Sequence, residues 1–77
     1  MRSMSEIVNL VVDGKLTTQR EARAIVDEQA QNLAAIEQLT VDEAREEFRR
    51  DLALAAILCT PSQRDRLREI FELKEPR

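Results

Sequence analysis

The stretch Thr40-Val41-Asp42-Glu43 carries the signature of a helix start. In this capping box the threonine hydroxyl accepts the backbone N–H three residues later, while the glutamate side chain reaches back to the N–H of the threonine. Three further pairs have the same spacing: Ser3 with Glu6, Thr18 with Glu21, and Thr60 with Gln63. Because each box opens a helix, the chain is predicted to contain four helices and to have an all-α fold.

The limits of these helices follow from where apolar residues recur at the helical period of about 100° per residue. The pattern predicts helices over residues 5–13, 18–38, 41–59 and 61–73. Gly14, the only glycine, predicts a left-handed stop after the first helix. Pro61 suits the first position of the fourth helix, because a backbone N–H at that position would have no hydrogen-bond partner within the helix. A chain of 77 residues has room for one domain, so we expect a single compact bundle over residues 1–77.

The two ends of the chain carry separate expectations. Met4-Ser5-Glu6 resembles a natural start of translation, so one alternative is that residues 1–3 are a remnant added ahead of it. In that case Ser5 would cap the first helix in place of Ser3. At the other end, Pro76 cannot continue a helix, and a frayed tail is expected over residues 74–77.

Few side chains in this sequence are suited to catalysis. The chain has no histidine, tyrosine or tryptophan, which removes the commonest general base and the commonest metal ligand. Cys59 lies on an apolar helix seam, where a core role is favoured over a nucleophilic one. Glu43 and Glu47 stand one turn apart but lack a matching Glu-x-x-His motif for a metal. We therefore expect no enzymatic activity, no cofactor, no metal and no small-molecule substrate.

Charge and hydropathy give an expectation about the compartment. The net charge is −3, with both signs interspersed along the chain. The longest apolar run, 52–59, is far shorter than the roughly 20 residues that span a bilayer. A lone cysteine cannot form an internal disulfide, and no signal-peptide pattern precedes the first helix. A cytoplasmic protein without membrane insertion is expected.

Two segments carry more apolar surface than a small bundle needs. In the first helix, apolar residues cover more than half of the circumference, and in the third they lie on two opposite sides over the last two turns. Such surplus predicts an interface with another protein. The candidate interface residues are Val8, Val12, Leu54, Ile57 and Leu58. The alternative is that these residues form the bundle interior, with the first and fourth helices enclosing the third.

The remaining core positions follow from the helical stripes. The fourth helix presents Leu67, Ile70 and Phe71 to the core. Gln29 falls within the apolar stripe of the second helix, where it could hydrogen-bond across the interior. The favoured interpretation places Gln29 at the edge of the stripe with its amide in water. The expected apolar positions of the second and third helices are Ala22, Ile25, Val26, Leu33, Ile36, Leu39, Val41, Ala44, Phe48, Leu52, Ala55 and Cys59.

Three arginines give a competing hypothesis of DNA binding. Arg64, Arg66 and Arg68 crowd the fourth helix, and the stretch 60–67, Thr-Pro-Ser-Gln-Arg-Asp-Arg-Leu, resembles the opening helix of sigma-type and response-regulator helix-turn-helix domains. That resemblance implies a DNA-binding regulator, in which helices that follow read the major groove. Neighbouring acids dilute the arginines, and the chain has no basic stripe, so nucleic-acid binding is the less favoured alternative.

The favoured hypothesis is a small non-enzymatic protein–protein interaction module. It would serve as an adaptor, as an inhibitor or antitoxin-like regulator, or as a phage or bacterial accessory protein. Its expected partner is another protein or a second copy of itself, in a homodimer formed through apolar helix surfaces.

Overall fold

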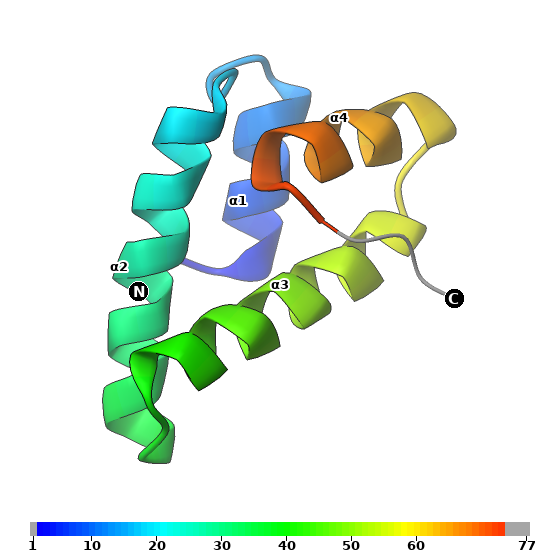
Figure 1. Cartoon of the computed structure of the whole chain (residues 1–77). Coiled ribbons are helices and arrows are strands. Elements are labelled where there is room, and N and C mark those ends of the chain that lie inside the picture. The colour runs from blue at the N-terminus through cyan, green and yellow to red at the C-terminus, as the bar shows by residue number, and fades with distance from the viewer. Residues whose placement is uncertain (1, 74–77) are drawn as a thin grey trace.

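The computed structural model describes residues 2–73, which form four α-helices and no strand. The helices are α1 (Met4–Val12), α2 (Gln19–Glu37), α3 (Val41–Ile57) and α4 (Pro61–Phe71) (Figure 1). The predicted all-α bundle is confirmed, and every boundary lies within two residues of the expected one. The frayed tail predicted for residues 74–77 lies outside the described residues.

The helices cross one another rather than running side by side. Helices α2 and α3 share the most extensive contact, and α4 packs on α1, α2 and α3. In Figure 1 the second half of α2 and the first half of α3 form a corner that extends beyond α1 and α4. Most of the main core is therefore built from the rest of the bundle, together with Phe48 near the middle of α3. Its buried residues are Ile7, Val11, Leu16, Ala22, Ile25, Val26, Phe48, Leu52, Ala56, Leu67, Ile70 and Phe71.

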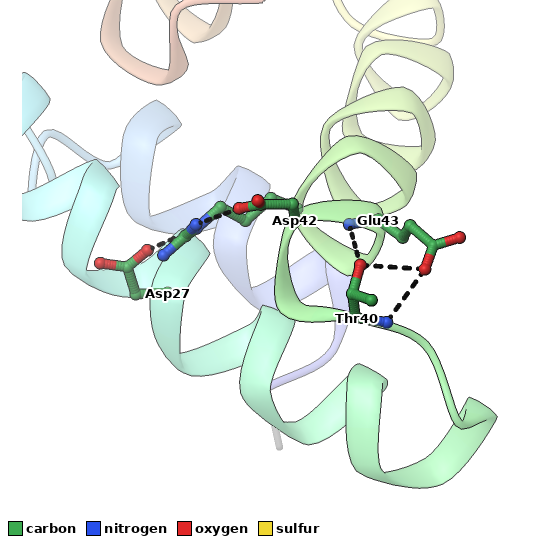
Figure 2. Close-up of polar contacts among 5 residues, drawn as sticks. Asp27, Thr40, Asp42 and Glu43 are labelled. Carbon is green, nitrogen blue, oxygen red and sulfur yellow. Dashed lines mark hydrogen bonds and ion pairs between the residues drawn. The ribbon is translucent and has the colours of Figure 1, made fainter.

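All four predicted capping residues cap their helices. The Ser3 hydroxyl accepts the Glu6 N–H at 3.2 Å, so Ser3 caps α1 in this chain and Ser5 lies inside the helix. The boxes at Thr40 and Thr60 are reciprocal, whereas in α1 and α2 no side chain reaches back to the backbone N–H of the capping residue. In α2 the Thr18 hydroxyl donates to the Glu21 carboxylate at 2.9 Å instead. Figure 2 shows the Glu43 carboxylate turned back toward Thr40. Both the Thr40 N–H and the Thr40 hydroxyl donate to this carboxylate, and these bonds lower the pKa of Glu43, the N–H contributing more.

Thr40→Ala is expected to lower the free energy of unfolding by about 1 kcal/mol, because the Glu43 N–H at the start of α3 loses its acceptor. Urea denaturation followed by circular dichroism measures this change. Thr17→Ala is the matched control, since Thr17 is exposed and lies outside every helix. Equal stability of the two variants would contradict a structural role for the Thr40 cap.

Polar contacts fix the corner between α2 and α3. Gln38 takes a left-handed conformation with φ of 57° and ends α2. The Arg45 guanidinium then bridges the helices, because it contacts Asp27 at 2.9 Å and Asp42 at 2.8 Å (Figure 2). These exposed ion pairs link α3 to α2 at the corner and contribute little to stability.

A second set of contacts fastens the end of α4 to the start of α2. The Gln19 side chain donates to the Glu69 carbonyl oxygen at 3.0 Å, and Arg23 pairs with Glu72 at 2.7 Å. Glu72 has a left-handed φ of 56° and ends α4. The chain then turns so that Leu73 packs against the core.

Gln29 corrects the sequence analysis. Its side chain is buried, with only 4% of its surface exposed, so the predicted edge position is wrong. Its Nε2 atom has no hydrogen-bond partner among the described residues. This nitrogen therefore does not form the hydrogen bond across the interior that the sequence offered as an alternative. Ala30 and Ala44 are also fully buried. These small side chains belong to α2 and α3, the two helices that share the most extensive contact.

Gln29→Met is expected to raise the free energy of unfolding by about 1 kcal/mol, because an unpaired buried amide is replaced by an apolar side chain of similar shape. The comparison variant is Gln31→Met on the exposed side of α2, which should leave stability unchanged. Both are measured by urea denaturation. Destabilisation by Gln29→Met alone would indicate that the amide makes a contact important to the fold.

Candidate protein-binding site

The C-terminal end of α3 exposes three large apolar side chains. The exposed fractions are 59% for Leu54, 48% for Ile57 and 90% for Leu58. Positions i, i+3 and i+4 lie on one side of a helix, so these residues form one surface, here called the α3 face. The alternative that they belong to the bundle interior is wrong, because Leu52 and Ala56 on the opposite side of α3 fill that role.

A groove of about 470 Å³ lies beside the α3 face. Leu54 and Ile57 belong to both the face and the groove. Ala53 and Leu73 add further apolar surface, and charged side chains complete the walls. The full lining consists of Glu46, Arg49, Arg50, Ala53, Leu54, Ile57, Glu72 and Leu73. Apolar and charged side chains line this groove together, as they do in many protein-binding surfaces.

The charges of this groove are only partly paired. Glu72 is held by Arg23, and the hydrogen bond from that guanidinium lowers the pKa of Glu72. Arg49 differs, because its Nε atom is buried without a hydrogen-bond partner among the described residues. The groove wall therefore contains a cationic side chain with an unused donor.

Acidic side chains crowd the surface of α3 ahead of the α3 face. Burial raises the pKa of Glu47, and the nearby carboxylates of Glu37 and Asp51 raise it further. Arg50 opposes this shift without cancelling it. The first part of α3 therefore carries more acidic than basic side chains, although Arg45 pairs with Asp42.

Glu47→Gln is expected to stabilise the fold at neutral pH and to lose that advantage in acid. A raised pKa means that the ionised Glu47 carboxyl opposes folding, and this cost disappears as pH falls through the raised value toward the ordinary 4.5 of glutamate. Melting temperatures of variant and wild type should therefore converge in acid. Glu46→Gln, one position away and exposed, is the control. A constant difference between variant and wild type at every pH would contradict this account.

The two predicted interface residues of α1 do not join the α3 face. Val8 is half-buried and packs against the core, because α1 contacts both α3 and α4. Val12 is 37% exposed in the last turn of α1. Figure 1 shows the C-terminal end of α1 leading into α2, well away from the C-terminal end of α3. The five predicted residues therefore do not form one surface.

Sequence reasoning also misplaced two residues of the α2–α3 corner. Ile36 and Val41, assigned to apolar core stripes, are 68% and 38% exposed. The corner extends beyond α1 and α4, so these stripes continue past the helices that would cover them. In α3 the buried seam continues through Ala56, while the expected Ala55 and Cys59 are half-buried.

The three arginines of the DNA-binding alternative do not form one basic surface, because Arg66 lies on a different side of α4 from Arg64 and Arg68. Arg64 donates to the carbonyl oxygens of Ala56 and Ile57, both at 3.4 Å, and so caps the C-terminal end of α3. Arg66 lines a separate groove of about 360 Å³ beside the start of α2. Arg68 is half-buried. The guanidinium of Arg64 is thus engaged within the fold.

Comparison with known protein families, curated proteins and solved structures finds no match for this chain. Within residues 2–73, no helix combines the length and apolar character needed to cross a membrane. In the same part of the chain, no three histidine, cysteine or acidic side chains are grouped so that they could hold a metal ion.

Proposed function

We propose that this protein is a small non-enzymatic interaction module that associates with a second copy of itself through the α3 face. The observation that carries the proposal is the exposure of Leu54, Ile57 and Leu58 on one side of one helix. A module of this kind acts by occupying a surface, as an adaptor, an inhibitor or antitoxin-like regulator, or a phage or bacterial accessory protein does. A cytoplasmic setting belongs to the same proposal, supported by the single cysteine.

The size of the α3 face sets the expected affinity. Burying one leucine or isoleucine side chain fully contributes about 1.5–3 kcal/mol, and a two-fold dimer buries three such side chains from each copy. All three are already partly covered, and association costs at least about 4 kcal/mol of lost translational and rotational freedom. The balance is at most about 2–8 kcal/mol, so a micromolar dissociation constant is the tightest that this surface supports.

Light scattering on the purified chain, over concentrations from low to high micromolar, tests this proposal. The weight-average mass is expected to rise from that of one chain to that of two. A mass that stays at one chain throughout this range would remove self-association as the function. Raising the salt concentration should leave the dimer largely intact, because apolar contacts carry most of the affinity.

A further inference from the structure

We draw no further inference here: the strongest candidate, the groove between α3 and the end of α4, sets Arg49 and Arg50 against Glu46 and Glu72 around its apolar residues, so its charges select no class of ligand and nothing in the structure shows what covers it.

Discussion

A chain carrying both Leu54→Glu and Ile57→Glu is expected to remain monomeric at concentrations at which the wild type is dimeric. A two-fold dimer would bury four new carboxylates in an apolar contact, and buried charges without partners are strongly unfavourable. We expect dimerisation to weaken by about 100-fold or more. Both side chains are about half exposed or more in the single chain, so the fold itself should be retained. Sedimentation equilibrium measures the loss.

The matched control for this variant is the pair Ile36→Glu and Val41→Glu. These residues are also exposed and apolar, but they lie at the α2–α3 corner, away from the C-terminal end of α3 (Figure 1). The control should dimerise as the wild type does. If the corner variant loses the dimer and the α3 variant keeps it, the interface has been assigned to the wrong end of the molecule.

Leu52→Ala is expected to lower the free energy of unfolding by about 2–5 kcal/mol, because Leu52 is fully buried and its truncation leaves a cavity. A domain of this length has a total stability of only about 3–5 kcal/mol. Much of the variant population should therefore be unfolded at room temperature. Urea denaturation followed by circular dichroism, at concentrations too low for dimerisation, measures the change.

Leu58→Ala is the matched control for Leu52→Ala, since it removes the same atoms from the same helix at a position that is 90% exposed. In the monomer it should change stability by less than about 0.5 kcal/mol. At high concentration Leu58→Ala should weaken the dimer. Leu52→Ala cannot test the dimer, because much of that variant is unfolded. Equal destabilisation of the monomer by the two variants would contradict the observed burial of α3.

The helices could be predicted from the sequence because their ends are set by local chemistry. Each capping hydroxyl bonds a backbone N–H three residues away, as at Thr40 and Glu43, so no distant part of the chain is needed. The turn after α1 is equally local, since Gly14 adopts the positive φ of 74° that glycine permits without strain.

Burial could be predicted less well because it depends on which helix lies opposite. Ile36 and Val41 continue apolar stripes, yet the crossing of the helices leaves both without cover. Val8 shows the opposite error. The apolar surface of α1 looked larger than the bundle needs, but α1 contacts both α3 and α4, so most of that surface is buried. Periodicity identifies an apolar side but not the helix that covers it.

The groove beside the α3 face had no signal in the sequence. The groove is lined by Glu72 and Leu73 after the end of α4 and by Arg49 of α3. The left-handed conformation of Glu72, which ends α4, places these two residues beside α3. The capping of α3 by Arg64 was missed for the same reason, since it joins the end of one helix to the next. Leu54, Ile57 and Leu58 could be found because they stand opposite an apolar seam of their own helix.

The most direct test of the α3 face is to record NMR spectra of the backbone amides and leucine and isoleucine methyl groups while the protein is diluted. The account predicts concentration-dependent shifts at Leu54, Ile57 and Leu58 and at the start of α4, with constant signals from the core and from Ile36. Shifts confined to α1 or to the α2–α3 corner, or no shifts up to high micromolar concentration, would contradict it.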